Sequence, residues 1–126
     1  MKRLLIIAFI AVFSLPAIAQ NEGSPVVNAL KAGNAEAVSG YFDKILDLKF
    51  PEKDEIKSIG KNQAGIAFKS FYDDNNIKGF DLSSQREMGG TMYIAGKLLN
   101  DGSGYKISIM LKAKEGKLQI ITVRIS

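Results

Sequence analysis

Few side chains in this chain could take part in chemistry. Its 126 residues include neither histidine nor cysteine, the usual ligands of zinc and copper. We therefore expect no metal site of that kind, and no cofactor. Asp43, two residues after Tyr41, is the acid best placed to act as the general base of an isomerase or dehydratase. The simpler interpretation is a solvated aspartate beside a helix, because Asp is ordinarily exposed.

A second group of polar side chains is better suited to holding a ligand than to reacting with it. Small-molecule pockets are mostly apolar, with a few polar groups that converge. The candidates for such a pocket are Tyr105, Thr122, Arg124, Arg86 and Tyr72. The tyrosines also suit core packing with the hydroxyl at an edge, so their presence alone does not define a site.

Arg124 is the residue on which this pocket depends. The alternation of its strand predicts that Arg124 points to the apolar face, where a charge is costly unless it is paired. One interpretation is an internal ion pair with Asp43, Asp47 or a neighbouring acid. The others are a clamp for an acidic ligand, which suits arginine, and a position at the open rim.

The elements that must position these side chains begin with four strands in a row. Asp-Gly, Gly-Gly and Glu-Gly turns separate apolar runs that alternate with polar residues, which is a strong hairpin signal. The predicted strands are Phe80–Met88, Thr91–Leu99, Tyr105–Lys112 and Lys117–Ile125. The pattern therefore indicates an antiparallel meander.

Regular alternation assigns the residues of this meander to two faces. The predicted inner face carries Met92, Ile94, Gly96, Leu98, Tyr105, Ile107, Ile109, Leu111, Leu118, Ile120, Thr122 and Arg124. A two-residue turn at Gly89-Gly90 and a three-residue turn place the first strand oppositely. The three-residue turn, which hydrophobicity favours, adds Phe80, Leu82, Ser84, Arg86 and Met88 to the inner face. The predicted outer face holds an apolar patch of Tyr93, Met110, Ile121, Val123 and Ile125, which favours a homodimer.

The residues before Phe80 read as helices and a short hairpin. Ser24-Pro25 starts one helix that ends at Gly33, and Asn34 caps a second. Leu46 to Phe50 and Glu55 to Ile59 form a hairpin of two short strands, stopped at Pro51. A third helix from about Lys61 to Tyr72 carries an aromatic stripe that includes Phe68 and Phe71. These elements predict an α+β domain.

The order of elements resembles the nuclear-transport-factor-two-like (cystatin-like) fold, a curved antiparallel sheet of about five or six strands wrapped around N-terminal helices. Individual segments are similar to a family of small exported bacterial proteins described as a domain of unknown function. The residues that carry the resemblance are Leu30–Ala35 with Tyr41–Asp43, Lys61–Ala64 with Phe68, Phe71 and Tyr72, Tyr93–Gly96, Gly104–Tyr105 and Val123–Ile125. The resemblance implies an architecture and an exported location, and no activity.

The first nineteen residues have the features of a secretory signal peptide. Met1-Lys2-Arg3 is basic, Leu4 to Phe13 is apolar but too short to span a membrane, and Ala17-Ile18-Ala19 fits signal peptidase. We expect residues 1–19 to be cleaved and residues 20–126 to form a single domain in the periplasm or medium. The chain has no cysteine for lipid attachment, so we do not expect a lipoprotein.

Charge and composition restrict the partners. The formal charge of +4 is partly the export signal, and the lysines are spread along the chain without a run. We therefore expect no nucleic-acid partner and, after cleavage, no membrane partner. Three functions stay open: a non-catalytic binding module with a small apolar or acidic ligand, a small isomerase or dehydratase on the same fold, and a structural dimerisation domain.

The predicted cleavage can be checked by mass spectrometry. Protein recovered from the periplasm or the medium should have the intact mass of a chain that begins at Gln20, because Ala17 and Ala19 occupy the positions that signal peptidase reads. A mass that still includes residues 1–19 would contradict both the cleavage and the expected domain boundary.

Overall fold

The computed structural model describes residues 24–126 of this chain. The predicted signal peptide and its cleavage site lie outside the described residues. Among the described helices, none is both long and apolar enough to cross a membrane.

Three helices precede or interrupt the sheet: α2 (Ser24–Lys31), α3 (Ala35–Ser39) and α4 (Lys61–Asn75). The predicted caps are confirmed, since the Asn34 side chain accepts the Ala37 N–H at 3.1 Å and Gly33 has a left-handed backbone with φ of 68°. The second helix has only five residues, because the chain turns at Gly40 and Phe42 already belongs to a strand. The third is longer by three residues and ends at a left-handed Asn76.

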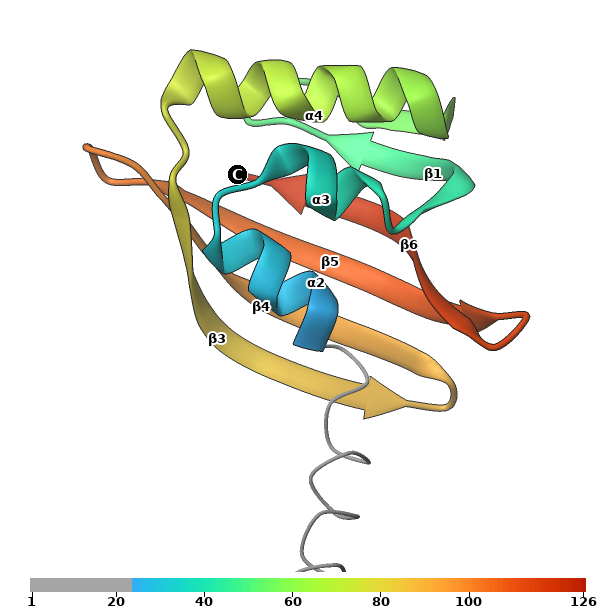
Figure 1. Cartoon of the computed structure of the whole chain (residues 1–126). Coiled ribbons are helices and arrows are strands. Elements are labelled where there is room, and N and C mark those ends of the chain that lie inside the picture. Colours follow the sequence, from blue (N-terminus) through green and yellow to red (C-terminus); the bar gives the residue numbers. More distant parts are fainter. Residues whose placement is uncertain (1–23) are drawn as a thin grey trace, which may run out of the picture.

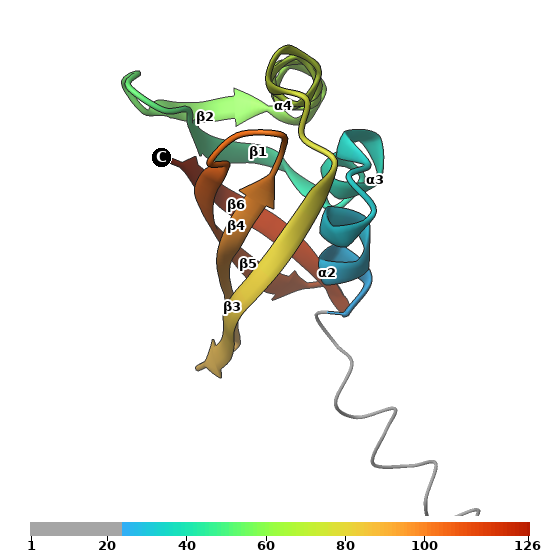
Figure 2. The same ribbon diagram turned by 90° about the vertical axis from the view of Figure 1, so that its left-hand side faces the viewer.

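Six strands form one sheet: β1 (Phe42–Lys49), β2 (Ile56–Gly60), β3 (Gly79–Met88), β4 (Thr91–Leu99), β5 (Tyr105–Lys114) and β6 (Lys117–Ile125). Their order is β2-β1-β6-β5-β4-β3. The meander is confirmed, and β1 joins it by pairing in parallel with β6. The sheet curls around the helices (Figures 1 and 2). Helix α4 lies across the β1–β2 end of the sheet, and α3 and α2 lie below α4 in Figure 1.

The core fills the space between the curled sheet and the helices. Phe68 of α4 is fully buried and meets the Phe42 ring edge-on at 5.7 Å between centroids. Leu30 of α2 and Leu98 and Leu111 of the sheet are also fully buried. Phe71 is only partly buried and stacks on Phe50 with centroids 5.3 Å apart. The aromatic stripe of α4 is therefore confirmed as core at Phe68, whereas Phe71 lies at the core's edge.

A β-bulge in β6 reverses the predicted faces of its last residues. Leu111 pairs with Ile120 but Met110 pairs with Thr122, so Ile121 is an extra residue in the ladder. Beyond it Val123 is buried and Arg124 is exposed. The predicted inward positions of Thr122 and Arg124 are therefore wrong.

The same bulge removes the predicted apolar patch from β6. Val123 and Ile125 have no exposed surface and belong to the core, where they pair with Ile109 and Ile107. Of the β6 residues predicted to face outward, Ile121 alone is partly exposed. The surface that motivated a homodimer is therefore absent on this strand.

A second bulge, in β3, divides that strand's inner and outer residues. Leu82 pairs with Gly96 and Ser84 with Ala95, so Ser83 is extra. Met88 pairs with Thr91 across a two-residue Gly89-Gly90 turn. The prediction is confirmed for the inward residues Phe80 and Leu82, which precede the bulge.

After the bulge the prediction fails. Arg86 pairs with Tyr93 and lies on the outer face with Ser84 and Met88, so their predicted inward positions are wrong. Between these outer residues, Glu87 pairs with Met92 on the inner side.

Gly96 is required where Phe80 crosses β4. A Cβ at Gly96 would lie 2.5 Å from the Phe80 ring and 2.3 Å from the carbonyl oxygen of Asp81. The absence of a side chain lets β3 approach β4 closely as the sheet bends.

The bulge in β6 predicts opposite outcomes for two neighbouring substitutions. Ile125→Ala should lower the free energy of unfolding by about 2–5 kcal/mol, because it leaves a cavity in the core. Arg124→Met should lower it by at most about 1 kcal/mol, because Arg124 is exposed and its ion pair is screened by water. Chemical denaturation measures both, and the reverse ranking would indicate an unbulged strand with Arg124 inside.

Candidate functional site

The five residues predicted to form a pocket do not meet. Tyr72 and Tyr105 belong to the helix-covered side, whereas Thr122, Arg124 and Arg86 lie on the outer face of the sheet. The two bulges cause this separation, because each changes which face the following residues occupy.

Arg124 pairs with an acid, but it does so on the outer face of the sheet. Its Nη2 lies 3.2 Å from Glu55 Oε2, and the Arg124 side chain is 52% exposed. The sequence named Asp43, Asp47 or a neighbouring acid as its partner. Glu55 is a different acid from Asp43 and Asp47, and it directly precedes β2, which lies next to β1 in the sheet. The pair contributes little to stability at that exposure.

The two tyrosines near the end of α4 have different surroundings. The Tyr105 hydroxyl donates to Asn75 Oδ1 at 2.8 Å, and its ring meets Phe71 edge-on. The Tyr72 hydroxyl is buried without a hydrogen-bond partner among the described residues, and burial raises the pKa of this phenol far above its usual range. Neither hydroxyl is available in the manner of a ligand clamp.

Asp43 is buried and already paired. Its Oδ2 lies 2.5 Å from Lys114 Nζ, and its Oδ1 accepts the Lys44 N–H at 2.8 Å. The Lys114 ammonium holds the pKa of the Asp43 carboxyl below its usual range, and the Lys44 amide acts in the same direction while burial opposes both. A carboxylate stabilised in this way is a weak base, which disfavours the proposed general-base role.

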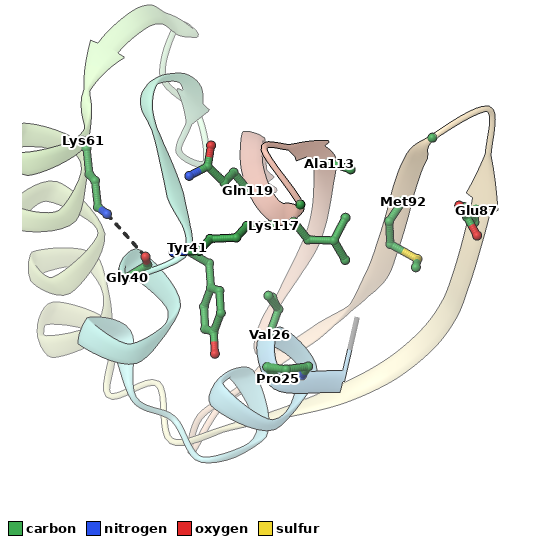
Figure 3. Close-up of a pocket in the computed structure, with 13 residues that line it drawn as sticks. Pro25, Val26, Gly40, Tyr41, Lys61, Glu87, Met92, Ala113, Lys117 and Gln119 are labelled. Atoms are coloured by element: carbon green, nitrogen blue, oxygen red, sulfur yellow. Dashed lines mark hydrogen bonds between the residues drawn. The ribbon is translucent and has the colours of Figure 1, made fainter. Parts of the chain in front are cut away.

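An open hollow, called the mouth hollow, lies at the end of the curled sheet where the β3–β4 and β5–β6 hairpins turn. It measures about 820 Å³ and is bordered by the start of α2, the corner between α3 and β1, and the ends of the β3–β4 and β5–β6 hairpins. Its apolar wall consists of Pro25, Val26, Met92 and Leu118. Figure 3 shows Pro25, Val26 and the Tyr41 ring on one side of the hollow, with Met92 and Glu87 across from them.

Polar groups stand around this apolar wall. They are the ammoniums of Lys61 and Lys117, the carboxylate of Glu87, the phenol of Tyr41 and the amide of Gln119. Lys61 Nζ donates to the Gly40 carbonyl at 3.4 Å, which ties the start of α4 to the α3–β1 corner (Figure 3). The Tyr41 carbonyl accepts the Ile120 N–H at 2.7 Å, which fixes this corner to β6. The arrangement suits an apolar molecule that carries an acidic group.

A profile described as "Domain of unknown function (DUF4783)" matches residues 24–126. This chain belongs to the DUF4783 family.

Solved structures agree with this assignment. A DUF4783 protein from Bacteroides ovatus is 22% identical, with a TM-score of 0.72 over 80% of this chain and 90% of that one. Another from Bacteroides uniformis is 19% identical, with a TM-score of 0.74 over 82% and 94%. An NTF2-like protein of unknown function from Cytophaga hutchinsonii is 12% identical, with a TM-score of 0.57 over 85% and 87%.

The likeness confirms the predicted nuclear-transport-factor-two-like α+β fold. No curated protein matches this DUF4783 chain in sequence. Within residues 24–126, no cluster of three or more acids could hold a metal ion.

Sequence reasoning did not find the hollow of this DUF4783 domain, although one signal for it was present. In an antiparallel meander the first and third turns lie at the same end, so the Gly89-Gly90 and Glu115-Gly116 turns had to be neighbours. The contribution of Lys61 and Tyr41 could not be read from the meander, because it depends on how α4 and β1 cross the sheet.

The Asp43–Lys114 pair predicts a pH-dependent contribution to stability. Lys114→Met should lower the free energy of unfolding at neutral pH by about 1–3 kcal/mol, because it leaves a buried carboxylate without its charged donor. A lowered folded-state pKa stabilises the fold above the unfolded value of about 3.9, and this contribution is lost as pH falls through the folded pKa.

The difference between wild type and Lys114→Met should therefore shrink below about pH 4. Lys112→Met, an exposed neighbour on the same strand, is the control. Denaturant titrations across this pH range measure both variants. An unchanged stability difference at low pH would contradict the assigned role of the pair.

Proposed function

We propose that this protein is an exported, non-catalytic binding module that holds a small amphipathic molecule in the mouth hollow. The ligand would place an apolar chain or ring against Met92, Leu118 and Val26, and an acidic group near Lys61 and Lys117. The observation that carries the proposal is the coexistence of an apolar wall and two rim ammoniums in one open hollow.

The size of the hollow supports this proposal. Its volume of about 820 Å³ lies within the range of about 300–1,000 Å³ that small-molecule sites occupy. The deep interior is occupied by buried side chains such as Phe42, Phe68 and Ile120. A ligand would therefore bind at the mouth and not in the centre of the cone.

A binding role is favoured over an isomerase or dehydratase by the state of the acids. Asp43 is engaged by Lys114 and does not line the hollow. Glu87, the acid that does line it, is an exposed residue of the β3–β4 hairpin and lacks the buried setting in which isomerases place a general base. Periplasmic or secreted location and a homodimer stay predictions, and the dimer no longer has the β6 patch as its basis.

The proposal is tested with dodecanoate as the probe, measured by its displacement of the fluorescent anion 8-anilinonaphthalene-1-sulfonate. Leu118→Trp should weaken dodecanoate binding about tenfold or more, a change of about 1.4 kcal/mol, because the larger side chain occupies the hollow. Ile66→Trp is the matched control, since Ile66 lies on α4 with 69% of its surface exposed and outside the hollow.

The charged part of the proposal is tested by one double variant. Replacing Lys61 and Lys117 together by methionine should weaken dodecanoate while leaving the uncharged dodecanol unaffected, because only the acid uses the ammoniums. Absence of dodecanoate binding to the wild type would reject an amphipathic ligand. Equal losses in Leu118→Trp and Ile66→Trp would place binding elsewhere.

A further inference from the structure

The outer face of the sheet, on the side opposite the helices (Figure 2), has a trough of its own. The trough measures about 620 Å³. Its lining includes the small residues Ser83, Ala95 and Ser108, the apolar Ile107 and Ile125, and four cations: Lys49, Lys97, Lys106 and Arg124. These four cations come from four different strands, so they do not form a run of charge in the sequence.

Strand register determines how the cations are arranged. Lys97 of β4 pairs directly with Lys106 of β5. One row further, Arg124 of β6 lies between Ser108 of β5 and Lys49 of β1. Three strand spacings separate Lys97 from Lys49, which corresponds to about 14 Å across the sheet. The cations therefore lie at both ends of a short track.

The charges of the track are only partly neutralised. Arg124 pairs with Glu55 at 3.2 Å, and Asp81 of β3 lies opposite Lys97. Lys49 Nζ donates to the neighbouring Phe50 carbonyl at 3.1 Å. Neither Lys97 nor Lys106 makes an ion pair among the described residues. Two like charges in directly opposite positions destabilise a sheet, so a bound anion would relieve this repulsion.

We propose that the outer trough binds a linear chain of phosphate groups. Beside its apolar residues, the trough is lined by ammoniums, a guanidinium and hydroxyls, all of which can donate to phosphate oxygens. A track about 14 Å long suits several linked phosphates rather than one ion.

The test uses inorganic tripolyphosphate and a longer polyphosphate as probes, with affinity measured by calorimetry at two salt concentrations. Wild type should bind the longer chain more tightly, and rising salt should weaken binding because the contacts are ionic. The double variant Lys97→Gln and Lys106→Gln should lose affinity about tenfold or more, as expected when two charge-assisted contacts are removed. Without ligand its melting temperature should equal or exceed that of wild type, because the repulsion is gone.

The matched control is the double variant Lys31→Gln and Lys69→Gln, which removes the same charge from exposed positions on α2 and α4. It should bind polyphosphate as wild type does. Equal losses in the two double variants would mean that only net charge matters, and would overturn the proposal. No binding by wild type would also overturn it, as would binding to phosphatidylglycerol vesicles without binding to polyphosphate.

Discussion

Two β-bulges, at Ser83 in β3 and at Ile121 in β6, determine which side chains enter the cone. Each inserts one residue into the ladder, bends the strand and exchanges its faces beyond that point. Without the bulge in β6, Arg124 would point into a core that includes Leu48 and Ile109, and Val123 and Ile125 would face water. The hydrophobic effect favours the bulged register strongly, since burying one large aliphatic side chain is worth about 1.5–3 kcal/mol.

The curvature that follows from these bulges explains where an open space remains. The sheet closes around Phe42 and Phe68 at its centre, where these two rings are buried and pack edge to face. At the wide end, the β3–β4 and β5–β6 hairpins diverge from the start of α2 and leave the mouth hollow open (Figure 3). The position of the mouth hollow in this DUF4783 domain is thus a consequence of how the sheet bends.

The bulge in β6 also places the positive charge of Arg124 on the outer face of the sheet. Arg124 lines the outer trough together with Lys49, Lys97 and Lys106. In the sequence these cations are spread over 75 positions, from Lys49 to Arg124, and they read as a dispersed, solvated set. Lateral pairing of β1 with β6, and of β4 with β5, brings them onto one track. A dispersed sequence charge and a concentrated surface charge are therefore compatible in a small sheet.

The sequence by itself determined the order of the elements and the positions of their turns and caps, and the resemblance of that order to a known fold implied the nuclear-transport-factor-two-like architecture. These depend on local chemistry: Asn34 caps, Gly33 ends a helix and alternating residues pair. The tertiary structure decided the faces beyond each bulge, the parallel contact of β1 with β6, the partners of Asp43 and Arg124, and the place of the hollow. Alternation has a period of two, so one inserted residue reverses every later assignment. Whether a strand bulges depends on the core it must cover, and that core is assembled from distant residues.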